Sequence, residues 1–363
     1  MRRRAAAPTV VGMTETLIIG GGQSGLTAAY HLTRLGHDCL VLDAGERVGD
    51  SWRRRWPSLR LYSPARYDEL PGLRFPAPRH SFPTGREMAD YLEAYAERFE
   101  LPVRTGVEIE SLSREGDRYV AVADGERFEA ANVIVATGGF RDPYVPPLAS
   151  ELDPALTQLH SHDYRGPEQL QPGPVLVVGA AHSGGDIAYE LVQAGHETLL
   201  SGRDTGQIPF RLEGQATKVV FPVLRFMWTR VLTVRTPIGR KARRKVRAHG
   251  GPLLRVKNAD LRAAGVERVA RVAGVSDGLP VLEDGQVVDV ANIVWCTGFH
   301  NDYSWIRFPL PLGEDGYPEQ TRGAVAGVPG LYFVGLKFQD SFGSTLILGA
   351  VRDAERVAKQ IAA

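Results

Sequence analysis

The sequence has few cysteines, almost no net charge and no long apolar run. Only two of its 363 residues are cysteine, Cys39 and Cys296, and no C-x-x-C pair occurs. This excludes a dithiol redox centre, a zinc cluster and a disulfide framework, and no metal site is expected. Because free cysteine is among the most often buried residue types, both thiols are expected to be buried apolar groups in a protein of the reducing cytoplasm.

The formal net charge is +1, which gives no reason to expect a nucleic-acid partner. The basic N-terminus lacks the apolar core of a signal peptide, and residues 1–12 are expected to be a disordered extension. No run approaches the roughly 18 apolar residues of a membrane span. The nearest, Val219–Val234, is interrupted by Arg225 and Arg230, so no transmembrane segment is expected.

What the sequence does contain is glycine, 40 residues of it, in a strand–glycine loop–helix–strand unit that occurs twice. The first unit comprises strand Thr16–Ile19, loop Gly20–Gly25, helix Leu26–Leu35 and strand Asp38–Leu42. The second comprises strand Pro174–Val178, loop Gly179–Gly184, helix Asp186–Gln193 and strand Glu197–Leu200. Each unit is typical of a dinucleotide-binding βαβ fold.

Later segments complete both units. Strands are expected at Asn132–Ala136 and Asn292–Cys296, each after a small β-meander, and at Gly330–Val334. A terminal helix is expected over Ser344–Ala362, capped by Ser344 or Thr345. Because the chain returns to its first unit after the second, an α/β fold is predicted with two Rossmann-like domains, one inserted into the other. The expected bounds are 13–165 plus 299–363 for the outer domain and 166–298 for the inserted one.

In such a loop the first glycine permits the tight turn, the second lets a pyrophosphate approach the backbone, and the third lets helix and strand pack closely. Gly20, Gly22 and Gly25 fit this pattern, and Asp43 stands where an acid would bind ribose hydroxyls. The second loop has Ala181 in place of the middle glycine, where a methyl group would crowd the pyrophosphate. Its second strand is followed by Arg203, which favours the 2′-phosphate of NADPH over NADH; the alternative is an exposed loop cation.

Residues 207–254 break the pattern and are interpreted as an insertion on the second domain. The basic cluster from Arg240 to Arg247 is expected to be a solvated face, with an anionic partner or a membrane surface as the alternative. Four aromatic residues either pack in a core or cover a substrate entrance: Phe210, Phe221, Phe226 and Trp228.

Several motifs together resemble the flavin-containing monooxygenase-like oxidoreductases, including bacterial CzcO-like flavoproteins and plant YUCCA-type enzymes. They include LIIGGGQSGL (17–26), VLDAGERVGDSWRRRWPSLRLYSP (41–64), VLVVGAAHSGGDIAYEL (175–191), VWCTGF (294–299) and the segment 329–358. The resemblance extends from Thr16 to Ile361 and implies FAD in the outer domain and NADPH in the inserted domain.

The resemblance also implies the binding residues. For FAD they are Gly20, Gly22, Gln23, Ser24, Gly25, Asp43, Trp52, Arg53, Val107, Thr137, Gly138 and Leu346. For NADPH they are Gly179, Ala181, His182, Ser183, Gly184, Arg203, Thr297 and Gly298. Leu346, at the start of the last helix, would lie near the flavin pyrimidine ring, where a helix N-terminus stabilises the charge of reduced flavin.

The function implied is oxygenation of a small organic substrate by molecular oxygen through a C4a-(hydro)peroxyflavin. Ser63, His160 and His182 are the candidate catalytic side chains. His160, Ser161 and Tyr164 match the end of the family's monooxygenase fingerprint, but Pro154 and Leu156 stand where it has an aromatic residue and a glycine. Two alternatives therefore stay open: an NADPH-flavin reductase or oxidase, and a flavoprotein sensor without turnover. A homo-oligomer is compatible with the sequence.

Overall fold

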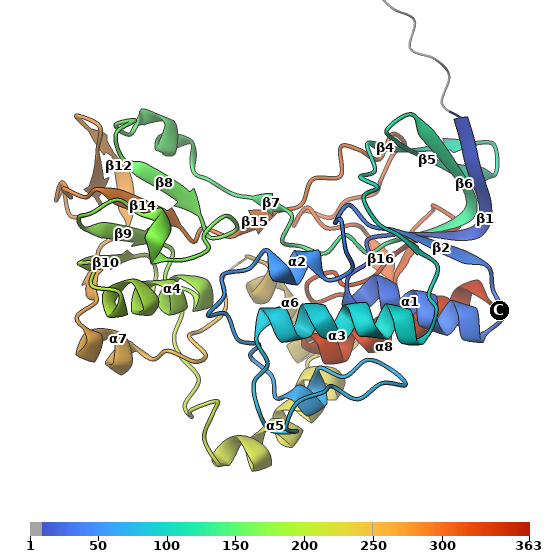
Figure 1. Cartoon of the computed structure of the whole chain (residues 1–363), viewed down its shortest axis with the longest axis horizontal. Coiled ribbons are helices and arrows are strands. Elements are labelled where there is room, and N and C mark those ends of the chain that lie inside the picture. The colour runs from blue at the N-terminus through green and yellow to red at the C-terminus, as the bar shows by residue number, and fades with distance from the viewer. Residues whose placement is uncertain (1–8, 249) are drawn as a thin grey trace, which may run out of the picture.

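The computed structural model describes residues 9–248 and 250–363, which form two lobes (Figure 1). The first lobe, on the right in Figure 1, contains both ends of the described chain; the second, on the left, is built from its middle. The chain crosses between them twice, at β7 (Asp142–Pro143) and β15 (Phe299–His300). These two crossings pair antiparallel with each other, so the second lobe is an insertion that leaves and re-enters at one place.

The first lobe is organised around a sheet whose central strands are parallel. Its order runs β16 (Gln320–Thr321), β17 (Ala324–Val325), β18 (Leu331–Phe333), β6 (Glu126–Val135), β1 (Thr9–Ile19), β2 (Cys39–Leu42) and β3 (Val103–Arg104). β4 (Ser111–Glu115) and β5 (Arg118–Ala123) extend β6 as the expected antiparallel meander. Successive residues of β1 alternate between two cores: Ile18 packs under the helices, whereas Leu17 and Ile19 pack under the meander.

The helices of the first lobe cover one face of this sheet. They are α1 (Gln23–Arg34), α3 (Gly85–Arg98) and α8 (Ile347–Ile361), with the short α2 (Asp50–Arg53) and η1 (Ala65–Tyr67) beside them. α3 begins with a capping box in which the Thr84 side chain accepts from the Glu87 amide and Glu87 accepts from the Thr84 amide. The predicted Ser344 or Thr345 cap of α8 is wrong, because a 3₁₀ turn (η5, Phe342–Thr345) precedes the helix and Leu346 is its N-cap.

The first strand is longer than predicted. The sequence placed its start after Met13 and residues 1–12 in a disordered extension, but β1 begins at Thr9 and pairs with β6 from Thr9↔Glu126 onward. The physical reason is the meander, which prolongs β6 and offers residues 9–12 a backbone to pair with. The remainder of that expectation, residues 1–8, lies outside the described residues.

The second lobe repeats the first in smaller form. Its parallel sheet has the order β11 (Glu267–Val269), β10 (Thr198–Ser201), β9 (Val175–Val178), β14 (Asn292–Trp295) and β8 (Thr157–His160). α4 (His182–Gln193) and α7 (Asn258–Ala264) cover one face, and the hairpin of β12 (Val272–Ser276) and β13 (Leu279–Leu282) covers the other with η2 (Pro147–Glu151). β8 pairs with β14 and η2 packs on the same sheet, so residues 147–160 belong to this lobe, although the expected boundary at 165 assigned them to the first domain.

The 207–254 segment is a strap that connects the lobes. It contains α5 (Ala216–Phe226), a short π-helical turn (η4, Met227–Val231) and α6 (Pro237–Ala248), and its ends meet at the Gln207↔Leu253 bridge of the second lobe. Its middle docks on the first lobe, where Thr233 pairs with Ser341 and the Val234 amide donates to the Asp340 carbonyl at 2.9 Å. α5 lies at the lower tip of the molecule in Figure 1.

The basic cluster on α6 is not simply a solvated face, because Arg247 is turned inward. Its side chain is 1% exposed, donates to Asp315 at 2.8 Å and to the Lys337 carbonyl at 2.9 Å, and lies 3.9 Å from the centre of the Tyr317 ring. These contacts fix α6 to the first lobe.

Replacing Arg247 by methionine should therefore release α6. Arg247→Met keeps an unbranched side chain but leaves the Asp315 carboxylate and the Lys337 carbonyl without this donor. We expect amide hydrogen exchange in residues 237–248 to accelerate about tenfold or more, as measured by mass spectrometry. Arg244→Met, on the exposed side of the same helix, is the control; equal acceleration in both variants would contradict the role assigned to Arg247.

Candidate functional site

The first glycine loop joins β1 to α1 and leaves one side open. A Cβ at Gly20, whose φ is +110°, would lie 2.6 Å from the Ala136 carbonyl oxygen, and a Cβ at Gly25 would lie 1.9 Å from the Gly20 carbonyl oxygen. Gly20 and Gly25 are therefore required for packing. A Cβ at Gly22 would meet nothing within 4 Å. Gly22 and the first amides of α1 thus border free space, as a phosphate cradle requires.

Polar and apolar groups predicted to bind FAD gather around this loop. The Asp43 carboxylate accepts from the Gly21 amide at 2.5 Å and from the Gly45 amide at 2.8 Å, which places it beside the loop. Val107 is buried next to Asp43, and the Val107 amide donates to the Asp43 carbonyl at 2.9 Å. Ser24 is buried at the start of α1, where a Cβ at Gly335 would lie 2.8 Å from its hydroxyl.

The N-terminus of α8 lies at the same edge of the sheet. Because β1 and β18 are both parallel to β6, the helices that follow them begin at the same edge, and α1 and α8 share one apolar core. Leu346 is the N-cap of α8, so the amides after it face the edge that carries the Gly20–Gly25 loop. Thr137, which follows β6, lies beside that loop, since a Cβ at Gly20 would be 3.1 Å from the Thr137 amide nitrogen.

Two first-lobe candidates are engaged elsewhere. Arg53 donates to the Val48 carbonyl and to the carboxylates of Asp90 and Glu93 at 2.6–2.9 Å, so its guanidinium ties α2 to α3. The Ser63 hydroxyl donates at 2.5 Å to Asp68, a residue that sequence reasoning missed. Asp68 is fully buried, and burial holds the pKa of its carboxyl well above the ordinary value. The hydrogen bond to Asp68 therefore fixes the Ser63 side chain.

The second glycine loop has the same packing but not the same opening. A Cβ at Gly179 would lie 2.2 Å from the Cys296 carbonyl oxygen, and one at Gly184 would lie 1.7 Å from the Gly179 carbonyl oxygen. Where the first loop has Gly22 and free space, the second has Ala181 and the end of the strap. A Cβ at Gly250 would lie 2.7 Å from the Ala181 methyl, and one at Gly251 would lie 2.2 Å from His182 Nε2. The strap thus covers Ala181 and His182 with two glycines, Gly250 and Gly251, where a side chain would not fit.

Side chains from the first lobe reach both helix N-termini. Trp52 donates from its indole nitrogen to Gln23, the first residue of α1, at 3.2 Å, and its ring packs against the cores of both lobes. Tyr62 donates from its hydroxyl to Asp186 of α4 at 2.9 Å, and its ring centre is 5.4 Å from that of His182. Residues 52–62 of the first lobe thus contact the first turns of both α1 and α4, and we call this region the junction between the lobes.

Burial controls protonation at this junction. It lowers the pKa of His182 to about 4, assisted by the Lys337 ammonium, so His182 is neutral at neutral pH. It also raises the pKa of Asp186 to about 6, against the Tyr62 hydrogen bond and the Arg255 charge. Tyr62 lies in residues 61–64, which the resemblance places along the flavin, and Asp186 lies in the motif 175–191, but the hydrogen bond between them was not predicted.

His160 belongs to the crossing between the lobes. The His162 amide donates to its Nδ1 at 3.0 Å, so Nε2 carries the proton and donates to the Gly298 carbonyl at 3.0 Å. Burial lowers the pKa of His160, which keeps this neutral form. Thr297 donates to the Tyr144 carbonyl, and the φ angles of Gly138 and Gly298 are +74° and +89°. Together these residues shape the two interlobe crossings.

Arg203 follows β10 and is exposed. Beside it is a pocket of about 420 Å³, lined by Asp204, Asn258, Arg262, Val266, Glu267 and Arg268. Arg268 donates to the Gly202 carbonyl at 3.0 Å, so this cation lies against the same turn. Sequence reasoning missed Arg262 and Arg268, because they come from other elements. Ser183, in the first turn of α4, is partly buried.

The two thiols differ in position. Cys39 is buried in β2, as expected, whereas Cys296 is only partly buried beyond β14. Within residues 9–248 and 250–363, no group of three or more His, Cys, Asp or Glu side chains is placed to hold a metal ion. Among the same residues, no helix combines the length and the apolar character needed to cross a bilayer.

A family model described as pyridine nucleotide-disulphide oxidoreductase matches residues 17–213. The chain belongs to this family. A CzcO-like oxidoreductase of Geobacillus kaustophilus is 34% identical over 96% of the chain and 98% of its own length. The indole-3-pyruvate monooxygenase YUCCA1 of Oryza sativa subsp. japonica is 27% identical over 95% of the chain and 90% of its own length.

Solved structures agree with this placement. A flavin-containing monooxygenase from Stenotrophomonas maltophilia is 28% identical and matches 97% of the chain and 98% of its own chain with a TM-score of 0.77. This protein is therefore a flavin-dependent, monooxygenase-like oxidoreductase with the predicted pair of Rossmann-like domains. The same relatives support FAD and NADPH as its cofactors.

The two packing glycines and the open glycine of the first loop should respond differently to substitution. Gly25→Ala forces a Cβ against the Gly20 carbonyl and is expected to reduce stability by about 1–3 kcal/mol or more, measured as a lower midpoint in urea. Gly22→Ala is expected to leave that midpoint of the FAD-free protein almost unchanged but to lower FAD retention at least tenfold, measured by flavin absorbance after gel filtration. Equal FAD retention in Gly22→Ala and wild type would refute the cradle.

The partly buried His182 gives a pH dependence of known sign. Its native-state pKa is lower than in the unfolded chain, so its contribution to stability is complete above about pH 6.5 and is lost as the pH falls through about 4. His182→Asn removes this loss. We expect the melting temperature of wild type to fall more steeply than that of His182→Asn between pH 6.5 and 4. The exposed His80→Asn is the control, and parallel curves for wild type and His182→Asn would contradict the assignment.

Proposed function

We propose that this oxidoreductase is an NADPH-dependent flavin monooxygenase that transfers one atom of molecular oxygen to a small organic substrate. The observation that carries the proposal is the junction at which Trp52 touches the first residue of α1 and Tyr62 touches α4. Two dinucleotides held by the two loops would meet there. The match to a flavin-containing monooxygenase over nearly the whole chain supports the same reaction class.

The binding roles proposed for FAD follow from the open side of the first loop. Gly22 and the first α1 amides, with Gln23 and Ser24, would hold the pyrophosphate, Asp43 the ribose and Val107 the adenine. The N-terminus of α8 after Leu346 would face the pyrimidine end of the flavin, where its amides stabilise negative charge.

For NADPH, the first turn of α4 would hold the pyrophosphate, with Ala181, His182, Ser183 and Gly184 around it. Arg203 would meet the 2′-phosphate, with Arg262 and Arg268 close by as further cations. The strap covers Ala181 and His182, so Gly250 and Gly251 would have to shift for the dinucleotide to reach α4.

When bound, the flavin supplies hydride acceptance and oxygen activation. The protein's own side chains control the surroundings. Trp52 and Tyr62 close the junction with ring surface and exclude water. Asp68 fixes Ser63, and His182 stays neutral at the start of α4.

A reductase or oxidase is the second candidate, and the observation in its favour is the departure of Pro154 and Leu156 from the monooxygenase fingerprint. Such an enzyme would use the same two cofactors but release electrons to oxygen or to a protein acceptor.

Rapid mixing distinguishes these reactions. NADPH should reduce the bound flavin, and the reduced enzyme mixed with oxygen should show a long-lived near-ultraviolet band, with an atom of labelled oxygen recovered in product from a panel of thioethers, amines and carbonyl compounds. Rapid NADPH oxidation with stoichiometric hydrogen peroxide and no such band would indicate the reductase or oxidase. Failure of NADPH to reduce the flavin would refute both enzymes and indicate a sensor.

A further inference from the structure

α5 is apolar on both of its sides. On the inner side, Phe221 is buried and stacks on Tyr67 of the first lobe at 4.6 Å between ring centres. On the outer side, Val219, Val223 and Phe226 are 74%, 61% and 61% exposed, and Met227 continues the row. The spacing of these four residues places them in one stripe along the helix, which we call the α5 stripe. Such contiguous exposed apolar surface marks an interaction site more often than a solvated face.

The surroundings of the α5 stripe carry charge of one sign. Residues 214–259 contain no Asp or Glu. They contain twelve cationic side chains: Lys218, Arg225, Arg230, Arg235, Arg240, Lys241, Arg243, Arg244, Lys245, Arg247, Arg255 and Lys257. Three of these, Lys218, Arg225 and Arg230, are exposed on α5 and η4, the two elements that carry the stripe.

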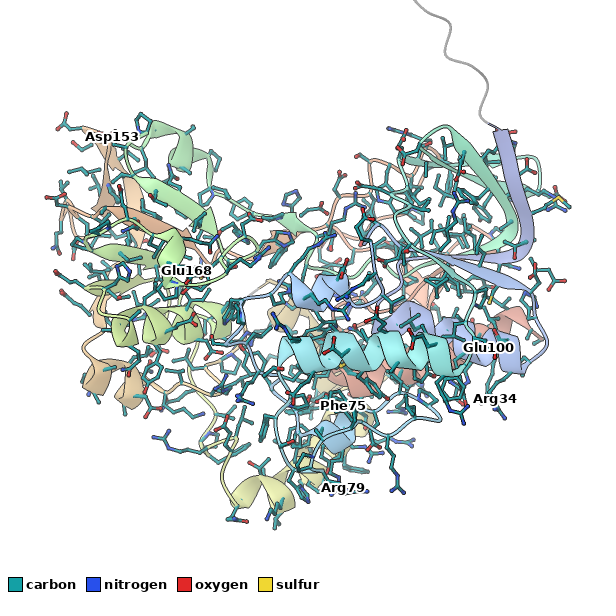
Figure 2. The ribbon with its side chains drawn as sticks, viewed as in Figure 1. Arg34, Phe75, Arg79, Glu100, Asp153 and Glu168 are labelled. Carbon is teal, nitrogen blue, oxygen red and sulfur yellow. The ribbon has the colours of Figure 1, made fainter. Side chains whose placement is uncertain are left out.

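The neighbouring first-lobe surface adds to the positive charge. Arg66 lies over the ring of Tyr67, the residue that stacks on α5. The Arg66 amide donates to the Arg79 carbonyl at 3.2 Å. Arg79 is at the lower edge of the molecule in Figure 2, the edge that carries α5 in Figure 1. Two acids of the first lobe that face the strap are already engaged, Asp340 with Arg235 and Arg356, and Asp315 with Arg247.

An apolar row flanked by arginine and lysine matches the surface of an anionic phospholipid bilayer. The apolar side chains would enter the boundary between head groups and acyl chains, and the cations would meet phosphate groups. A second copy of this chain fits less well, because two such surfaces face to face would oppose cation to cation. The described residues contain no helix able to span a bilayer, so the attachment would be peripheral.

We propose that the α5 stripe and its flanking cations dock this protein on an anionic phospholipid surface. The proposal does not depend on the reaction catalysed.

Co-sedimentation of the FAD-loaded protein with vesicles tests it. Wild type should bind vesicles containing phosphatidylglycerol, release from them as salt is raised, and bind pure phosphatidylcholine vesicles at least tenfold less well. Val223→Asp with Phe226→Asp should lower binding to the anionic vesicles at least tenfold. The matched control is Val287→Asp, a similarly exposed valine on the second lobe, which should bind as wild type does.

Flavin absorbance and the melting temperature establish that each variant is folded. The proposal is overturned if wild type does not bind anionic vesicles, or if the double variant binds them equally. It is also overturned if sedimentation velocity shows a wild-type dimer that Val223→Asp with Phe226→Asp converts to a monomer while vesicles are not bound, because the stripe would then be a self-association face.

Discussion

The close approach of a helix glycine to the carbonyl oxygen of the loop glycine five residues earlier organises each lobe. Gly25 lies against the Gly20 carbonyl, and Gly184 lies against the Gly179 carbonyl, at distances that leave no room for a side chain. This approach fixes where α1 and α4 begin relative to β1 and β9, and therefore where their free amides point. This approach defines one edge of each sheet. In the first lobe, Asp43 and the N-terminus of α8 lie at the same edge as the free amides of α1, so a single ligand could contact them together.

The two loops share this geometry but differ in what lies opposite the middle position. Gly22 borders free space, whereas Ala181 is met by Gly250 of the strap. The strap has its ends on the second lobe and its middle on the first, held by backbone pairing at Ser341 and by the buried Arg247. A shift of the first lobe would therefore move the strap against Ala181 and His182, because the strap contacts the first lobe and these two residues of the second.

Sequence alone predicted the repeated βαβ units, the insertion and the close packing at Gly20 and Gly25, because strand periodicity and glycine spacing are local signals. It placed the start of β1 and the cap of α8 incorrectly, because a distant partner decides each: the meander extends β1, and the η5 turn displaces the cap to Leu346. The Tyr62–Asp186 contact and the role of Asp68 were missed for a similar reason, since they arise from contacts between side chains that share no motif. For Arg247 the sequence pattern was misleading, because the run of cations from Arg240 to Arg247 predicts solvent exposure. Only the packing of α6 against Asp315 and Tyr317 shows that Arg247 points inward.

The paired crossings β7 and β15 give the chain a further property. The second lobe leaves and returns through neighbouring strands, so its two ends already lie side by side, with Phe299 opposite Pro143 and His300 opposite Asp142. Every strand of the first sheet lies outside the segment between them. Recombination could therefore replace the gene segment for the second lobe without interrupting any strand of the first sheet. A replacement domain would also need a segment that packs on the first-lobe surface around Ser341 and Tyr67, which the strap now contacts.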